Sequence, residues 1–211
     1  MSFLGEAYPR RSEMFFFTTV IVNGGSPIIS KNNIHYADVG IEIKQGNPYI
    51  SDNNITECSP NLIAPVGTIE RNYFDGIIQI GNAVVKSNTV TYIEVQESFS
   101  PTISNNNIGS IRLSSSTNVD AANNWWGTTN TTDIERAIWD YNDDFTLGKV
   151  NYTPFLTEPN PKAIPDPNAE IPTVNSQNTN QTLLIVSAVL SAVIAGSVII
   201  LLLRSKLSGK H

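Results

Sequence analysis

The chain repeats an eight-residue motif, first written as Pro27-Ile28-Ile29-Ser30-Lys31-Asn32-Asn33-Ile34. It returns as Pro48-Tyr49-Ile50-Ser51-Asp52-Asn53-Asn54-Ile55 and then, with more drift, at residues 67–74, 83–90 and 101–108. All copies have Ile or Val at the third position, asparagine at the sixth, and Ile, Val or Phe at the eighth. The motif is therefore an internal repeat, and the rest of the sequence is interpreted around it.

The sixth-position asparagines return at an internal period of about twenty residues, which is typical of solenoids. Successive copies lie 21, 19, 16, 18 and 17 residues apart, and the asparagines are Asn32, Asn53, Asn72, Asn88, Asn106 and Asn123. Asparagine tolerates the left-handed backbone region, and its amide can bond both the local backbone and an identical residue one turn away. We therefore expect these six side chains to stack as a ladder.

The strands of the repeat are short and half-buried, because apolar and polar residues alternate within each motif. A second alternating segment follows most copies, at residues 40–43, 76–80, 92–95 and 110–113. No sustained helical period occurs between residues 14 and 124, so turns must join the strands. These features predict an all-β fold, a right-handed parallel β-helix with Ile, Val and Phe stacked inside.

The alternative fold is an antiparallel sandwich or barrel built from the same short strands. That fold requires hairpin signals at its strand junctions. Asn23-Gly24 and Asp75-Gly76 are such signals, but they do not fall at every junction, whereas the asparagine motif does. The repeat therefore favours the β-helix.

The last copy changes into Asn123-Asn124-Trp125-Trp126-Gly127, which we expect to begin a cap over residues 123–156. Residues 132–135 form a capping-box pattern, and the short helix that it starts would cover the open end of the core. We therefore assign residues 1–156 to the β-helix domain.

The chain beyond residue 156 changes composition twice. Pro, Asn, Thr and Gln dominate residues 157–182, which predicts a disordered linker. Residues 183–203 form an uncharged apolar run of 21 residues, long enough to cross a hydrocarbon layer about 30 Å thick as a transmembrane helix. Residues 204–211 are a basic tail, and the positive-inside rule places them in the cytoplasm. The expected localisation is the cell membrane, single-pass, with the N-terminal domain outside.

An outward domain normally needs an export signal. The apolar run at residues 14–22 follows two arginines, but no small-residue cleavage site comes after it, so it is interpreted as a buried strand. A first turn without a cap would leave an unpaired sheet edge and an open core end. We therefore expect further turns and an export signal upstream of Met1.

Composition excludes several classes of function. The net charge is −6, and no cluster of Lys and Arg outweighs the acids before the apolar run, which argues against a nucleic-acid surface. Cys58 is the single cysteine, so there is no disulfide framework or cysteine-rich metal site. His35 has no second histidine nearby, since the other is His211, and a copper or zinc site therefore lacks ligands.

The C-terminal part of the repeat carries a resemblance to a known family. The asparagine repeat that closes on Asn-Asn-Trp-Trp-Gly, followed by Asp140 and residues 148–156, resembles the C-terminal end of right-handed parallel β-helix repeat proteins. These include pectate-lyase-like surface proteins and relatives of the periplasmic copper-site maturation factor. The resemblance covers residues 14–156. It implies the fold and leaves the activity open, because this superfamily contains lyases, hydrolases, epimerases and binding modules.

Carboxylates on one exposed sheet carry the chemistry of the sugar-cleaving relatives, so Asp52 and Glu70 are the catalytic candidates. They fall in successive copies of the motif, and neighbouring turns lie about 4.8 Å apart. A glycosidase needs two carboxylates, one of them with a raised pKa. Glu42 and Glu94 occupy outward positions on the second strands. Each strand offers only one acid, so solvated surface charge is the competing interpretation.

A calcium-dependent lyase would need several acids around the metal and a nearby base. Arg71 and Arg112 are available as bases, but the acids do not cluster around either of them in the sequence. In the cap, calcium could bind the carboxylates of Asp140, Asp143 and Asp144. That segment lacks the glycine and the terminal glutamate of the helix-loop-helix calcium motif, so a solvated turn is the competing interpretation.

Two further features bear on surface recognition. Trp125 and Trp126 could stack on a sugar, although their place at the end of the repeat also suits core packing. Four acceptor sequons are compatible with glycosylation of an outward domain, and they begin at Asn54, Asn130, Asn151 and Asn180.

The sequence thus predicts a membrane-anchored cell-surface β-helix with a structural, adhesive, or carbohydrate- or protein-binding role. Its expected partners are the membrane and a polysaccharide or envelope protein, not nucleic acid, and calcium is the only cofactor considered. The alternative is a polysaccharide lyase or glycoside hydrolase of the pectate-lyase-like superfamily, which requires ionisable groups that converge in a groove. A third role, metal delivery, finds too few His, Cys and Met residues.

Overall fold

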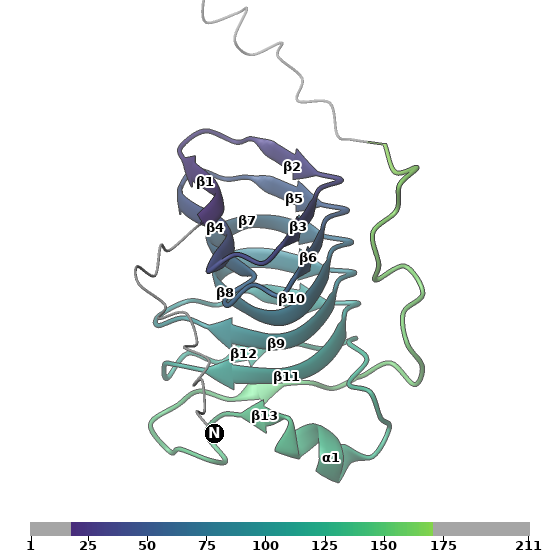
Figure 1. Ribbon diagram of the computed structural model, residues 1–211. Coiled ribbons are helices and arrows are strands. Elements are labelled where there is room, and N and C mark those ends of the chain that lie inside the picture. Colours follow the sequence, from purple (N-terminus) through teal and green to yellow (C-terminus); the bar gives the residue numbers. More distant parts are fainter. Residues whose placement is uncertain (1–17, 171–211) are drawn as a thin grey trace, which may run out of the picture. The chain divides into compact units, whose positions relative to one another are not determined.

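A computed structural model describes residues 18–170 and shows an all-β parallel solenoid (Figure 1). Every strand pair in this part of the chain is parallel. Within the same residues there is one short helix, α1 (Thr131–Arg136). The expected parallel solenoid, built from a sequence repeat, is thereby confirmed, and the antiparallel sandwich is wrong.

The strands form three rows that run along the solenoid. The first row consists of β1 (Thr18–Asn23), β4 (Val39–Gln45), β11 (Asn107–Leu113), β13 (Ile138–Trp139) and parts of β7 (Leu62–Glu70), β8 (Tyr73–Lys86) and β9 (Thr89–Val95). The second row consists of β2 (Ile28–Ser30), β5 (Tyr49–Ser51), the ends of β7 and β8, β10 (Thr102–Ser104), β12 (Val119–Asp120) and β14 (Val150–Asn151). The third row consists of β3 (Asn33–His35), β6 (Asn54–Thr56) and the opening residues of β8, β9 and β11.

The variation in repeat length has a structural cause in β8. The shortest repeat, from Asn72 to Asn88, contains β8, a continuous strand of 14 residues. Its opening residues pair with β6 in the third row, its middle with β9 in the first row, and its end with β10 in the second row. One strand therefore passes through all three rows. This turn is short because it has no loops between its rows.

The core consists of aliphatic columns that follow the strand register. In the first row Ile41 pairs with Leu62, and the column continues through Ile78, Ile93 and Ile111. The other two rows contribute the columns that contain Ile50 and Ile55, and Phe74 is fully buried among them. β-Branched side chains suit a pleated, buried surface. Burying them supplies the main favourable contribution to folding.

The asparagine ladder is continuous along the described solenoid. The side-chain oxygen of Asn53 accepts hydrogen bonds from both nitrogens of Asn32, and the same pattern joins Asn53 to Asn72. It continues through Asn88 and Asn106. Each ladder asparagine thus bonds the equivalent residue of the next turn.

Two details of the expected ladder are corrected. In the last turn the stacked side chain is that of Asn124, which accepts from Asn106, and not that of Asn123. The left-handed backbone also belongs to the residue before each ladder asparagine, as at Lys31, Arg71 and Asn123 with φ of 60°, 54° and 60°. The turn therefore needs positive φ at one position and a buried amide at the next.

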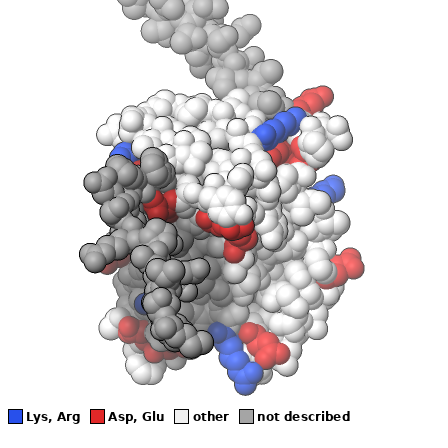
Figure 2. Space-filling view, viewed as in Figure 1, with Lys and Arg blue, Asp and Glu red and all other residues white. Residues whose placement is uncertain are grey.

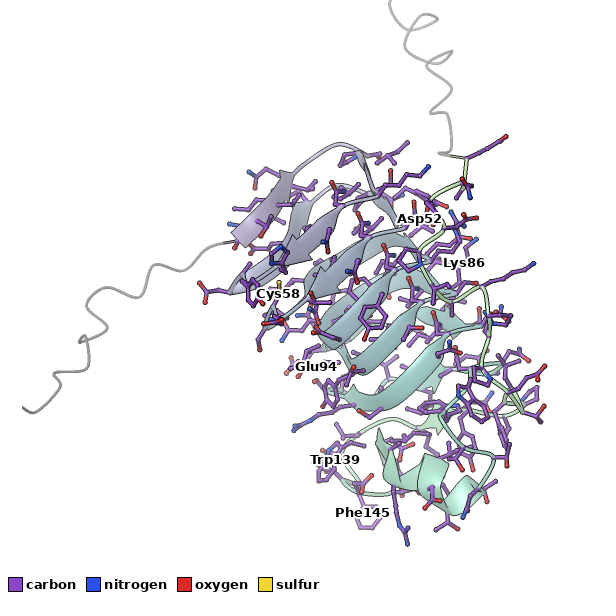
Figure 3. All side chains as sticks on the ribbon, turned by 45° about the vertical axis from the view of Figure 1, so that its right-hand side comes forward. Asp52, Cys58, Lys86, Glu94, Trp139 and Phe145 are labelled. Atoms are coloured by element: carbon purple, nitrogen blue, oxygen red, sulfur yellow. The ribbon has the colours of Figure 1, made fainter. Side chains whose placement is uncertain are left out.

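The C-terminal end of the core is covered by the cap. Trp126, which precedes the helix, and Ile134, which belongs to α1, are buried there. Trp125 forms a parallel bridge with Asn107. The helix begins two residues earlier than the capping box predicts, because Asn130, and not Thr132, is the N-cap, and its side chain accepts a hydrogen bond from the backbone of Thr132. Trp139 and Phe145 project from this end of the molecule (Figure 3).

The segment after the cap packs against the solenoid. Residues 157–169, which we call the strap, run back along the outside of the turns (Figure 1). This differs from the disordered linker expected over residues 157–182, because solenoid side chains bind the main chain of the strap. Residues 171–182 lie outside the described residues.

Several expectations concern parts of the chain that the structure does not describe. They are the apolar run at 183–203, the basic tail at 204–211 and the run at 14–17. Within residues 18–170, the one helix is too short and too polar to cross a bilayer.

Candidate functional site

The candidate site lies around Arg71, where the strap passes the turns that join the second row to the third. Arg71 takes the same position in its turn as Asp52 does in the turn before, each directly preceding a ladder asparagine. Its Nε and Nη2 donate to the two carboxylate oxygens of Asp52 at 2.9 Å and 3.0 Å. Its Nη1 lies 2.7 Å from Oε1 of Glu70. The two carboxylates that the sequence singled out are therefore brought to one guanidinium.

Glu70 has two further partners on the second row. Tyr49 donates its hydroxyl to Oε2 of Glu70 at 2.6 Å, and the ammonium of Lys86 lies 3.3 Å from the same oxygen. Tyr49 comes from the preceding turn and Lys86 from the following one. We call these five residues, Tyr49, Asp52, Glu70, Arg71 and Lys86, the Arg71 cluster.

Asp52 is the buried member of the cluster, with only 5% of the residue exposed. Its Oδ1 also accepts the backbone N–H of Asp166 in the strap at 3.0 Å. Burial acts to raise the pKa of Asp52, but the hydrogen bonds from Arg71 and from the Asp166 backbone outweigh it and hold this pKa below its ordinary value. Asp52 is therefore a stable carboxylate and a poor proton donor.

The remaining pKa shifts in the cluster have the same origin. Burial, together with the hydrogen bond to Glu70, raises the pKa of the Tyr49 phenol. The Asp52 carboxylate raises the pKa of Arg71 further above its already high ordinary value. Asp52, Arg71 and Tyr49 are thus each held in the charge state that their neighbours favour. This pattern is typical of an ion-pair network that fixes structure.

The strap is fixed mainly through its main chain. Asn107 clamps Asn160 by accepting from its N–H at 2.8 Å and donating to its carbonyl at 3.1 Å. Thr89 donates to the carbonyl of Ala163 at 2.6 Å, and the side chain of Ala163 is fully buried. At the first turn, Lys31 donates to the carbonyls of Pro167 and Ala169. Asp52 and Lys86 lie beside this segment (Figure 3).

A pocket of about 500 Å³ opens between the strap and the solenoid. Arg71 is its contribution from the solenoid, and the strap supplies the other lining residues: Pro161, Lys162, Ile164, Pro165, Asp166 and Pro167. Three of the seven lining residues are prolines, and the charge of Arg71 is already balanced by Asp52 and Glu70.

The two acids expected on the second strands, Glu42 and Glu94, do not join the cluster. Glu42 and Glu94 both stand on the first row, where the register separates them by Ile63 and Gln79. Three turns place them about 14 Å apart along the solenoid, which exceeds the separation that glycoside hydrolysis requires of its two carboxylates. Glu94 accepts from Gln79 at 2.9 Å, and Glu42 lies 3.7 Å from Lys44.

The aspartates of the cap serve the local backbone. Asp140 is buried and accepts from the backbone N–H groups of Asn142 and Val150. Asp143 accepts from the backbone of Asp140, and Thr146 holds the pKa of Asp144 below its ordinary value by donating two hydrogen bonds. Across residues 18–170, no three His, Cys, Asp or Glu side chains are grouped so that they could hold a metal ion.

His35 and Cys58 lie apart from the cluster. The His35 ring contacts Tyr36 edge-to-face, with centroids 4.8 Å apart. Cys58 is a buried free thiol that donates to the carbonyl of Thr56, and burial raises its pKa. A raised thiol pKa lowers the fraction of reactive thiolate.

The sequons differ in how accessible their amides are. Asn54 donates its amide to Asn33 in the outer column of the third row, and Asn151 donates to Asp120. Asn130 is exposed, and its side-chain oxygen caps α1. Asn180 lies outside the described part of the chain.

The Arg71 pair and the strap were not expected from the sequence. A signal for the pair existed, because residues 52 and 71 are separated by the same 19 residues as Asn53 and Asn72. That spacing places opposite charges in one column. The sequence contains no comparable signal for the strap, since the hydrogen bonds that attach it to the solenoid use its main-chain groups.

Comparison of the chain with known protein families, with curated proteins and with solved structures finds no match in any of the three.

Proposed function

We propose that this protein is a membrane-anchored, cell-surface β-solenoid that acts by binding and scaffolding, with no catalytic step. Residues 183–203 would form the single span, with residues 204–211 on the cytoplasmic side. The resemblance to pectate-lyase-like repeat proteins supports a surface role, and that superfamily includes non-catalytic binding modules.

The observation that carries the proposal is the state of Asp52 and Glu70. Both carboxylates are engaged by Arg71, and Asp52 is buried beneath the strap with a lowered pKa. Glycoside hydrolysis needs an acid whose pKa is raised and a second carboxylate that can reach the sugar. The pair that neighbouring turns bring together therefore supports a structural role for these residues.

The surface chemistry agrees with a binding role that does not depend on bulk charge. On the face shown, acidic and basic side chains are interspersed among uncharged ones (Figure 2). This face offers no long stripe of one sign to a charged polymer such as a nucleic acid.

The first experiment tests for catalysis. The full chain is incubated with a panel of acidic and neutral polysaccharides, and new reducing or unsaturated ends are measured. We expect adsorption to at least one insoluble polymer without turnover. Turnover that is lost in Asp52→Asn or Glu70→Gln would establish the alternative, a lyase or hydrolase.

The second experiment tests the anchor. Cells that express the full chain are fractionated beside cells that express residues 1–182. We expect the full chain in the membrane fraction and the shorter chain in the soluble fraction. Recovery of the full chain as soluble protein would refute the membrane anchor.

A further inference from the structure

The third row carries a shallow groove that no part of the Arg71 cluster lines. Its volume is about 260 Å³, and it is lined by Tyr73, Thr89, Val90, Thr91, Asn107, Ile108, Gly109, Trp125 and Gly127. We propose that this groove binds a linear, neutral oligosaccharide. The proposal rests on the binding role given above, and it names the class of ligand and the surface that receives it.

Two aromatic side chains mark the ends of the groove. The register pairs Tyr73 with Thr89, Thr89 with Asn107, and Asn107 with Trp125, so all four side chains stand in one column. Three turns separate the rings by about 14 Å along the solenoid. Tyr73 is 37% exposed and Trp125 is half-buried. An aromatic ring offers an apolar face that can pack on the C–H face of a pyranose.

Thr89 and Asn107, which stand between the rings, hold the strap, and a flat floor of small residues lies beside this column. Thr91, Gly109 and Gly127 form the neighbouring part of the lining. A Cβ atom at Gly109 would meet the carbonyl oxygen of Thr91, so a side chain does not fit there. Thr91 is exposed, and its hydroxyl can bond a sugar hydroxyl directly or through water.

The strap borders one side of this floor. Thr89 and Asn107 line the groove and also hold the strap at Ala163 and Asn160. The strap therefore keeps the side chains of these two lining residues in fixed positions. A preformed groove lowers the entropic cost of binding.

The lining chemistry selects a neutral glycan. The lining contains no Lys, Arg, Asp or Glu, so an ionised ligand would lose hydration there without gaining a counter-charge. An extended peptide cannot add to the backbone here, because the opening residues of β8 pair on one side with β6 and on the other with β9. One pyranose unit is about as long as one turn of the solenoid is thick, so successive sugars can meet equivalent positions on successive turns.

The test uses the full chain and a β-1,4-linked glucose hexasaccharide, which is longer than the groove. Binding is measured by saturation-transfer NMR and by titration of tryptophan fluorescence. We expect Tyr73→Ala to weaken binding at least tenfold, and Thr91→Arg, which lays a long side chain across the floor, to abolish it. Tyr36→Ala is the matched control, because Tyr36 is 72% exposed and lies outside the groove; its affinity should equal that of the wild type.

The outcomes separate this proposal from the broader one. Adsorption to polysaccharide that persists unchanged in both groove variants would refute the groove and leave the binding role intact. Absence of any hexasaccharide binding by the wild type would also refute the groove. Cleavage of the hexasaccharide, with weaker binding by Tyr73→Ala, would support the groove and refute the non-catalytic role. Circular dichroism of both variants shows that a loss of binding does not come from unfolding.

Discussion

Arg71 donates two parallel hydrogen bonds to Asp52 on the preceding turn, from Nε at 2.9 Å and from Nη2 at 3.0 Å. Both residues have positive φ, 54° for Arg71 and 57° for Asp52, and both stand directly before a ladder asparagine. The same turn geometry therefore positions acid and base one above the other. The pair ties two turns together at the point where the strap crosses them.

Removal of the Arg71 guanidinium should destabilise the solenoid strongly. In Arg71→Met the buried carboxylate of Asp52 loses its partner while the aliphatic stem is retained. Breaking a buried pair from one side costs roughly 3 to 5 kcal/mol, and we expect the lower end of that range because Arg71 itself is partly exposed. Urea denaturation followed by circular dichroism measures the free energy of unfolding.

Arg136→Met is the matched control for that measurement. Arg136 pairs with Asp133 at 3.0 Å, but both side chains are exposed on α1. An exposed pair contributes about 0 to 1 kcal/mol. Equal losses in the two variants would contradict the role assigned to Arg71.

The contribution of Asp52 to stability should disappear in acid. Its pKa is lowered in the folded protein, against about 3.9 for an unfolded aspartate. The contribution is therefore fully present above about pH 4 to 5 and is lost as the pH falls through the lower, folded value. We expect the difference in unfolding free energy between the wild type and Asp52→Asn to shrink between pH 6 and pH 2. A difference that stays constant over this interval would contradict the assignment.

Removal of one ladder amide should cost more than a typical hydrogen bond. Asn72 donates its amide to two carbonyls and to Asn88, and its oxygen accepts twice from Asn53. In Asn72→Ala several buried groups lose their partner at once, at roughly 1 to 3 kcal/mol for each unsatisfied group. We expect a loss above about 3 kcal/mol in unfolding free energy.

Asn33→Ala is the control that distinguishes the loss of a ladder asparagine from the loss of any stacked asparagine. Asn33 lies in the outer column, is exposed, and accepts one hydrogen bond from Asn54. Exposed substitutions of this kind stay within about 0.5 kcal/mol. A large loss at Asn33, or none at Asn72, would contradict a stabilising inner ladder.

A charge introduced at Ala163 should detach the strap and leave the solenoid folded. Ala163→Glu places a charge where the side chain is fully buried, whereas Ile164→Glu changes the next residue, which is exposed. We expect protease cleavage and fast amide exchange within residues 157–169 only for Ala163→Glu. The midpoint of thermal unfolding of the remaining protein should change little, since the ladder and the three rows are untouched. Protection of the strap in both variants would show that Ala163 does not anchor it.

The solenoid could be predicted from the sequence because the residues that repeat are the ones that fill the core. Ile50, Ile69 and Val85 stand one period apart and pair in register, and the ladder asparagines follow the same spacing. The exception is the last turn, where Asn123 and Asn124 are adjacent. Both suit a turn, and only the register of the folded chain assigns the left-handed position to Asn123 and the stacked one to Asn124.

The candidate site could be predicted only in part. Asp52 and Glu70 were singled out as carboxylates on neighbouring turns, but outward-facing strand positions were expected to leave them in solvent. The fold buries Asp52, since the left-handed turn aims its side chain beneath the strap. The strap itself contains the proline-rich composition of a linker, and its attachment depends on carbonyl and N–H groups that every sequence possesses. Composition alone therefore could not distinguish it from a free segment.

The strap also determines how a mechanical load would enter the molecule. The strap begins after Leu156, which is bonded to the last turn, and ends at Ala169, whose carbonyl is bound by Lys31 of the first turn. A pull on the chain beyond Ala169 therefore acts first at Lys31, then at Asp52, Thr89 and Asn107 in succession. Only after these contacts have opened one by one does tension reach the cap. The thirteen residues of the strap reach at most about 45 Å when extended, and the attached strap already spans five turns, about 24 Å. Its release therefore adds about 20 Å of length while the solenoid stays folded.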